Sequence, residues 1–141
     1  MKVFCFRIGT EGYAVDTDHV VEVIKRPMVS PLPQGPAYLK GIFLYKTYVV
    51  PILNERTVLC VKNEEKGYNK VLILRAPEGI LSLEAKMEGV YVVEDELIEV
   101  PENIPERTRV FLKGLLRKAE GIYGLINIDA FVLDNLRNLE V

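Results

Sequence analysis

Residues 42–53 read IFLYKTYVVPIL, and this stretch decides the fold class. Two short apolar runs, 42–45 and 48–53, meet across the pair Lys46-Thr47, which is the pattern of a β-hairpin. Proline cannot donate a ladder hydrogen bond, so Pro51 predicts an edge strand or a bulge. The stretch therefore predicts antiparallel β-structure.

Similar short runs lie on both sides of this hairpin. Residues 2–8 alternate, with Phe4, Phe6 and Ile8 on one face, and the turn 9–12 returns the chain as a second strand, 13–16. The other expected strands are 71–74, 80–84, 90–93, 110–116 and 121–128. About ten short strands with turns between them are typical of small β-barrels or a sandwich. There is no βαβ alternation, and we see no clean internal repeat.

Helical signals are fewer. Asp18 is expected to cap a short helical turn through residues 20–24, which Pro27 ends. A second short helix is expected at 37–40, between Pro36 and Gly41. Asp129 is then expected to open a C-terminal amphipathic helix, whose apolar residues are Phe131, Val132, Leu133, Leu136 and Leu139. The polar stretch 62–70 and the acidic stretch 94–106 are expected to be loops.

Length and charge exclude several classes of protein. The chain has 141 residues, which suits one domain, and 49% hydrophobic with 27% charged residues suits a packed core. The net charge of −2 argues against nucleic-acid binding and a membrane-surface role. No apolar run approaches the roughly 20 residues of a transmembrane helix, and the N-terminus is not a signal peptide, so we expect a cytoplasmic protein. One Gln against fifteen Glu is typical of thermophile proteins.

Residues that carry chemistry are scarce. Cys5 and Cys60 form no CxxC pair and are expected to be buried small hydrophobes, and His19 has no paired base or nucleophile. No GxGxxG, GxxxxGK[ST], HExxH or GxSxG motif is present. We therefore expect a binding module without catalytic activity, metal or cofactor.

The order of elements resembles the CheW-like family of chemotaxis coupling proteins, across nearly the whole chain. The first hairpin, residues 4–16, is similar to the family's, and residues 20–24 (VVEVI) resemble its V-x-E-V/I turn. The approach through PLP (31–33) and PAYLKG (36–41) to VVPI (49–52) follows the family's pattern, as do 113–115 and 126–129 near the end. Each piece alone is weak, whereas their order and spacing together are fairly specific.

This resemblance implies a fold, a function and partners. The fold would be mainly β: two small SH3-like five-stranded barrels packed together, with short helices and a C-terminal helix. Residues 1–141 would form a single CheW-like domain of two intertwined barrel subdomains. The function would be that of a non-enzymatic adaptor that couples chemoreceptors to the histidine kinase CheA. Its partners would be the CheA regulatory domain and the cytoplasmic tip of a chemoreceptor, with no cofactor, nucleic acid or membrane insertion.

The chain departs from the family at one turn. Where the family usually reads N-L-R-G, this sequence has Leu44-Tyr45-Lys46-Thr47. Lys46 keeps the charge of the usual arginine and loses its planar fork. Thr47 is β-branched and resists the positive φ that glycine allows, so we expect a different turn geometry. Later, Ala85 stands where the family usually has an aspartate.

The expected partner-binding residues lie on and near this turn. Tyr45 and Tyr48 flank Lys46, and tyrosine is favoured at interfaces because it buries area and keeps a polar tip. Glu22 would orient a partner by its charge. The complete expected set is Val20, Glu22, Val23, Tyr38, Tyr45, Lys46 and Tyr48.

Two alternative functions stay open at this stage. The altered turn favours a divergent CheW-like module that binds another signalling partner or associates with itself. A barrel that binds a small ligand or an oligonucleotide is the other alternative, for which Tyr45-Lys46-Thr47-Tyr48 would be a minimal aromatic and basic platform.

Overall fold

The computed structural model describes residues 1–35, 37–55, 59, 68–77 and 79–130. It contains ten strands in this part of the chain, as the turn spacing predicts. They are β1 (Lys2–Ile8), β2 (Glu11–Asp16), β3 (Val20–Lys25), β4 (Leu39–Tyr45), β5 (Tyr48–Leu53), β6 (Lys70–Ala76), β7 (Gly79–Glu84), β8 (Lys86–Val92), β9 (Leu112–Lys118) and β10 (Gly121–Ile126). Two short helices, η1 (Thr17–His19) and α2 (Glu106–Arg109), accompany them.

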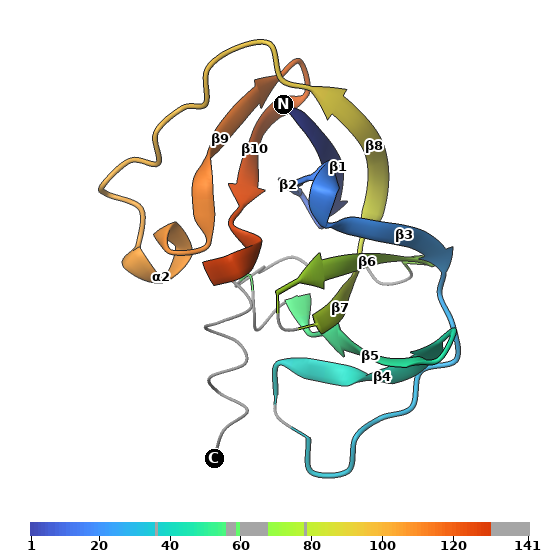
Figure 1. Ribbon diagram of the computed structural model, residues 1–141. Coiled ribbons are helices and arrows are strands. Elements are labelled where there is room, and N and C mark those ends of the chain that lie inside the picture. Colours follow the sequence, from blue (N-terminus) through green and yellow to red (C-terminus); the bar gives the residue numbers. More distant parts are fainter. Residues whose placement is uncertain (36, 56–58, 60–67, 78, 131–141) are drawn as a thin grey trace.

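The strands form two five-stranded sheets, which we call barrel A and barrel B. Barrel A has the order β8-β1-β2-β10-β9, and barrel B has the order β3-β6-β7-β5-β4. Figure 1 shows barrel A above barrel B, with the chain passing down through η1 into β3 and returning upward from β7 into β8. The expected mainly β fold with two five-stranded units is confirmed.

The two barrels have the same strand topology, although we saw no repeat in the sequence. In barrel B the strands run consecutively from β3 to β7, whereas barrel A is assembled from β8, β9 and β10 followed by β1 and β2. Each barrel has three antiparallel pairs and one parallel pair, in equivalent places. The repeat is circularly permuted, so a comparison of the two halves of the sequence in their written order misses it.

The equivalence holds residue by residue. The Ser30–Ile42 bridge in barrel B matches the Ile98–Leu115 bridge in barrel A. The backbone N–H of Asn54 donates to Tyr38 O at 2.6 Å, and that of Asn127 donates to Phe111 O at 2.7 Å. When the two barrels are compared by strand register, Gly41 is equivalent to Gly114, Val50 to Tyr123, Pro51 to Gly124 and Tyr45 to Lys118.

Each barrel has its own core, and a third core joins them. Alternation on β1 divides the strand as predicted, since Val3 and Cys5 lie inside barrel A while Phe6 and Ile8 face barrel B. The shared core, which we call the interbarrel core, also contains residues such as Tyr38, Val15, Leu72, Leu83, Phe111 and Ile126. Because strands bury both faces, runs such as 71–74 are apolar throughout.

Two expected helices are strands instead. Residues 20–24 belong to β3, because their β-branched side chains pair with β6, and only η1 before them is helical. The cap of η1 is Asp16, whose carboxylate accepts from the backbone N–H of Asp18 at 2.9 Å. Residues 39 and 40 of the second expected helix begin β4.

Three smaller expectations also need correction. Pro51 lies in β5, an inner strand between β7 and β4, and Ser82 Oγ donates to its carbonyl at 2.8 Å. The last described helical turn begins at Ile128. Its N-cap is Asn127 and not the expected Asp129, because the Asn127 side chain accepts from the Ala130 N–H at 3.4 Å. The strand expected from residue 110 starts at Leu112, after α2.

The remaining sequence expectations fall on loops and on segments that the structure leaves out. Between β8 and α2 the chain forms no strand, and Ile98 is its one bridged position, so the expected loop over 94–106 is confirmed. Cys60, residues 62–67 and the helical positions from Phe131 onward lie outside the described residues. Among the described helices, none is long and apolar enough to cross a membrane.

We expect Gly41→Ala to destabilise the protein by about 2 kcal/mol, because overpacking at a fixed backbone forces a local shift. A Cβ at residue 41 would lie 2.5 Å from Ser30 O and 2.8 Å from a Val29 methyl carbon, so the Ser30–Ile42 bridge must move. Gly114→Ala is the matched control, since its Cβ would lie 3.2 Å from Ile98 O. Urea unfolding of both variants checks this expectation, and equal losses would contradict it.

Candidate functional site

One end of barrel B forms an open hollow, which we call the open end. Strands β5 and β7 are parallel, so the Lys46-Thr47 turn before β5 and the Pro77 turn before β7 lie at the same end. Between them is a cavity of about 470 Å³. Its lining residues are Val21, Tyr45, Lys46, Tyr48, Arg75, Ala76, Pro77, Gly79 and Ile80.

A β-bulge on β3 places Glu22 beside this cavity. The register between β3 and β6 shifts between Val20 and Glu22, which interrupts strict alternation and leaves Glu22 exposed. Its carboxylate accepts a hydrogen bond from the Tyr45 hydroxyl. That hydrogen bond is the largest cause of the raised pKa of Tyr45, so at neutral pH the Tyr45 hydroxyl keeps its proton and donates.

Lys46 projects from the tip of the β4–β5 hairpin in a strained conformation. Its φ is +54°, and among the described non-glycine residues only Gln34 shares a positive φ. The positive φ thus falls on Lys46 and not on the β-branched Thr47. The Lys46 Nζ lies 5.2 Å from the centre of the Tyr45 ring, within the range of a cation–π contact.

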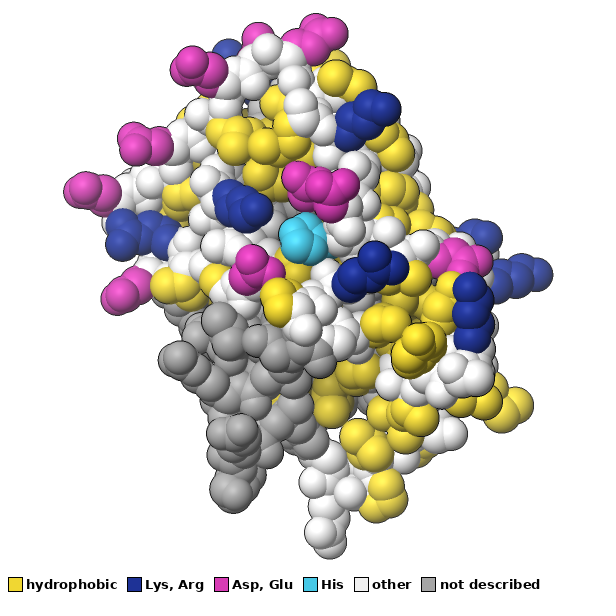
Figure 2. All heavy atoms as spheres, in the orientation of Figure 1, with side chains coloured by type: hydrophobic (Ala, Val, Ile, Leu, Met, Phe, Trp, Pro, Cys, Tyr) yellow, Lys and Arg dark blue, Asp and Glu magenta, His cyan; other side chains and the backbone are white. Residues whose placement is uncertain are grey.

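The open end combines positive charge with exposed apolar surface. Neither Lys46 nor Arg75 forms an ion pair with a described residue. On the outer face of the same hairpin, Leu44 and Val49 are 70% and 64% exposed, and on the cavity side Tyr48 is 55% exposed. Figure 2 shows hydrophobic side chains gathered toward the lower right of this face, over β4 and β5, with basic side chains beside them. Such a mixed surface suits a protein partner.

The equivalent end of barrel A is filled by its own side chains, and we call it the closed end. Tyr123 is fully buried there, and its hydroxyl donates to Glu88 Oε1 at 2.5 Å. Arg7 lies 5.0 Å from the centre of the Tyr123 ring and also donates to the Tyr123 hydroxyl. Lys118 Nζ lies 4.5 Å from the same centre. Burial and the Glu88 hydrogen bond together raise the pKa of Tyr123.

One substitution between the two barrels accounts for much of this difference. Tyr123 is equivalent to Val50, which is also fully buried but is much smaller. Likewise Lys118, which reaches over the Tyr123 ring, is equivalent to Tyr45, which turns to Glu22. Two barrels of one topology therefore have one closed end and one open end.

The structure brings four of the seven expected site residues together: Glu22, Tyr45, Lys46 and Tyr48. Val20 and Val23 lie on the other face of β3, half-buried against the interbarrel core. Tyr38 is 7% exposed in that core, away from the surface that we describe.

Sequence reasoning missed Arg75, Ile80 and Val49 as neighbours of this turn. The sequence does mark a turn at Pro77, but nothing in it says that this turn meets the Lys46 turn. That neighbourhood follows from the parallel pairing of β5 with β7. An apolar strand that ends in an arginine just before a proline turn is the signal that could have indicated Arg75.

Fold and site together define a class of protein: a double-barrel module that docks other proteins. No group of three or more His, Cys, Asp or Glu side chains that could hold a metal occurs among the residues described. Comparison with known proteins identifies the family within this class. The family model for the CheW-like domain matches residues 2–135, and the chain belongs to this family.

Curated relatives and a solved structure agree with this membership. The chain is 41% identical over 53 residues to a chemotaxis protein CheW from Treponema pallidum, a match that covers 38% of this chain and 31% of that protein. It is 19% identical to the chemotaxis protein CheW from Thermotoga maritima, over 93% of this chain and 87% of that protein. The scaffolding protein TtCheW from Thermoanaerobacter tengcongensis superposes with a TM-score of 0.80 at 18% identity, covering 92% of this chain and 90% of that one. These last two sources agree with the thermophile-like composition.

We expect Lys46→Gly to raise the free energy of unfolding by about 0.5–1 kcal/mol, because glycine adopts a positive φ without a Cβ penalty. The flexibility that glycine adds to the unfolded chain sets the upper limit of this gain. Urea unfolding measures it. Arg117→Gly, at an exposed and paired position of strand β9, is the control and should lose stability; a loss of stability in Lys46→Gly as well would contradict a strained turn.

We expect the free energy of unfolding to fall as the pH rises above about 10, and to fall less in Tyr123→Phe. Tyr123 has a folded pKa above its ordinary value of 10.0, so it stabilises the fold below pH 10, and this contribution is lost as the pH rises through the folded pKa. Urea unfolding between pH 8 and 11 measures the difference, because the raised pKa values of Cys5, Tyr38 and Tyr45 are present in both proteins. Identical pH dependence of the two proteins would contradict the role given to Tyr123.

Proposed function

We propose that this chain couples a chemoreceptor to a CheA-type histidine kinase, with the kinase regulatory domain bound at the open end. Family membership makes the chain a chemotaxis coupling adaptor. The CheW proteins of Treponema pallidum and Thermotoga maritima are chemotaxis proteins by name, and TtCheW is a scaffolding protein. In this proposal the chain acts as a single two-barrel unit in the cytoplasm and catalyses no reaction.

We choose the open end of barrel B as the docking surface because the two barrel ends differ. A partner can insert side chains into the cavity of barrel B, which Tyr45, Tyr48 and Ile80 line with apolar and aromatic surface. The closed end of barrel A offers no equivalent space, because Tyr123 occupies it. Lys46 and Arg75, which form no ion pair with a described residue, add positive charge that favours an acidic partner surface.

In this proposal the second partner, the receptor tip, binds the half-buried face of β3 that carries Val20 and Val23. Both side chains are only partly covered by the interbarrel core, and they lie on the face of β3 opposite to Val21 and Ile24, which pack on the core of barrel B. An apolar face on one side of β3 and a charged cavity on the other would allow two different partners to bind at once. Glu22, exposed between them, would then contact either partner.

We expect Lys46→Glu to weaken binding of the kinase regulatory domain about tenfold at low salt, because it reverses a charge at the centre of the docking surface. The effect should shrink in high salt, since ions screen exposed charges. Lys113→Glu is the matched control: Lys113 is also exposed, on barrel A, and should leave the affinity unchanged. Titration calorimetry at two salt concentrations measures this, starting from a micromolar complex of about −8 kcal/mol.

Equal affinities of Lys46→Glu and the unchanged protein would rule out the turn as a contact. A folded protein that binds no regulatory domain at all would favour the alternative, a divergent module with another partner. The exposed pair Leu44 and Val49, where the family's turn motif is replaced, is the observation that supports this alternative. Light scattering of the same sample would show whether that partner is a second copy.

A further inference from the structure

Barrel A carries a second cavity, on its outer face and far from the open end in the fold. It has a volume of about 340 Å³ and lies over β2, β10 and β9. Its lining residues are Thr10, Glu11, Gly12, Tyr13, Leu59, Thr108, Phe111, Leu112, Leu115, Ile122 and Gly124. This size is at the small end of the range found for ligand pockets, which begins near 300 Å³.

Gly124 lies in the wall of this cavity. A Cβ placed on Gly124 would lie 3.0 Å from a methyl carbon of Leu112 and 3.8 Å from the Tyr13 ring, so it would stand among the lining residues. The equivalent position in barrel B is Pro51, whose ring occupies the corresponding space. Gly124 does not need a positive φ, so the backbone gives no reason for a glycine there. A strand glycine without a conformational role often marks the close approach of another group.

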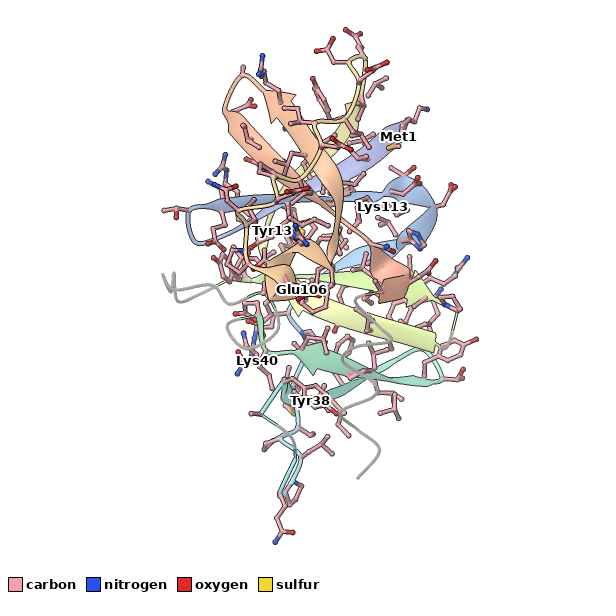
Figure 3. The ribbon with its side chains drawn as sticks, turned by 90° about the vertical axis from the view of Figure 1, so that its left-hand side faces the viewer. Met1, Tyr13, Tyr38, Lys40, Glu106 and Lys113 are labelled. Carbon is pink, nitrogen blue, oxygen red and sulfur yellow. The ribbon has the colours of Figure 1, made fainter. Side chains whose placement is uncertain are left out.

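The chemistry of the wall is apolar with an acidic rim. Leu112, Leu115 and Ile122 supply the apolar wall. At the rim, the Glu11 carboxylate accepts from the Tyr13 hydroxyl at 2.7 Å through one oxygen. Among the described residues that line the cavity there is no lysine, arginine or histidine, although Arg7 donates to the carbonyl of the lining residue Thr10 at 3.1 Å. In Figure 3 Tyr13 lies above Glu106, the first residue of α2; this helix also carries Arg109, so it adds no net negative charge to this face.

We propose that this cavity binds an aliphatic primary amine in its protonated form, which has an apolar chain and a cationic head. The hydrocarbon chain would lie against Leu112, Leu115 and Ile122, and the ammonium group would donate to Glu11. The Glu11 carboxylate would repel an anion, and no basic side chain stands among the described lining residues. This site is separate from the docking surface on barrel B and does not depend on the function proposed for that surface.

The test is a titration with hexylammonium, followed by backbone amide chemical shifts of the full chain. We expect saturable shifts confined to residues around the cavity, such as Gly12, Leu115 and Gly124. Hexanol, which has the same chain without charge, and hexanoate, which has the opposite charge, are the comparison ligands. Hexylammonium should bind at least tenfold more tightly than either.

Two variants test separately the space inside the cavity and the carboxylate at its rim. Gly124→Val should fill the cavity and abolish the shifts, because its side chain takes the place of the ligand. Glu11→Gln keeps the cavity and should reduce the affinity for hexylammonium to that for hexanol. Unchanged binding by a folded Gly124→Val, equal binding of all three ligands, or the absence of saturable shifts in the unchanged protein would each overturn the proposal.

Discussion

The apolar surface shared by the two barrels is the constraint on which the rest of the structure depends. A small barrel with an apolar outer face cannot stay in water, and here each barrel covers that face of the other. Phe6, Val15 and Leu72 lie in this interbarrel core and are almost completely buried. Side chains that point inward in each barrel then form two separate small cores. Strands that bury both faces leave only the barrel ends and the edges free for function.

The turns and the alternation in the sequence predict most of the strands, because hairpins are local structures. Prediction fails where the partner of a segment is distant. Residues 20–24 look like a poor helix by local rules, and they are a strand because β6, about fifty residues later, pairs with them. The short helix expected after Pro36 fails for the same reason, since Leu39 and Lys40 join the β4–β5 hairpin. Asn127 and Asp129 are both good caps, and only the structure shows which one accepts the hydrogen bond.

The candidate site was predictable in part. Glu22, Tyr45, Lys46 and Tyr48 lie on or beside one hairpin, so the sequence could place them near each other once the family resemblance was noticed. Arg75 and Ile80 join them through the parallel pairing of β5 with β7, which no local pattern reports. The contrast between Val50 and Tyr123 is harder still, because it has meaning only when the two barrels are superposed through their permuted topology.

That permuted topology also sets the order in which the chain can fold during synthesis. Barrel B uses residues 20–84 in one continuous segment, so all of its strands are available when the first 84 residues have been made. Barrel A needs β1 and β2 from the beginning of the chain and β8 to β10 from its end. The N-terminal hairpin therefore lacks its partner strands in barrel A until residue 126 emerges from the ribosome. Until then, the apolar side chains of the hairpin can pack on barrel B, which already presents its half of the interbarrel core.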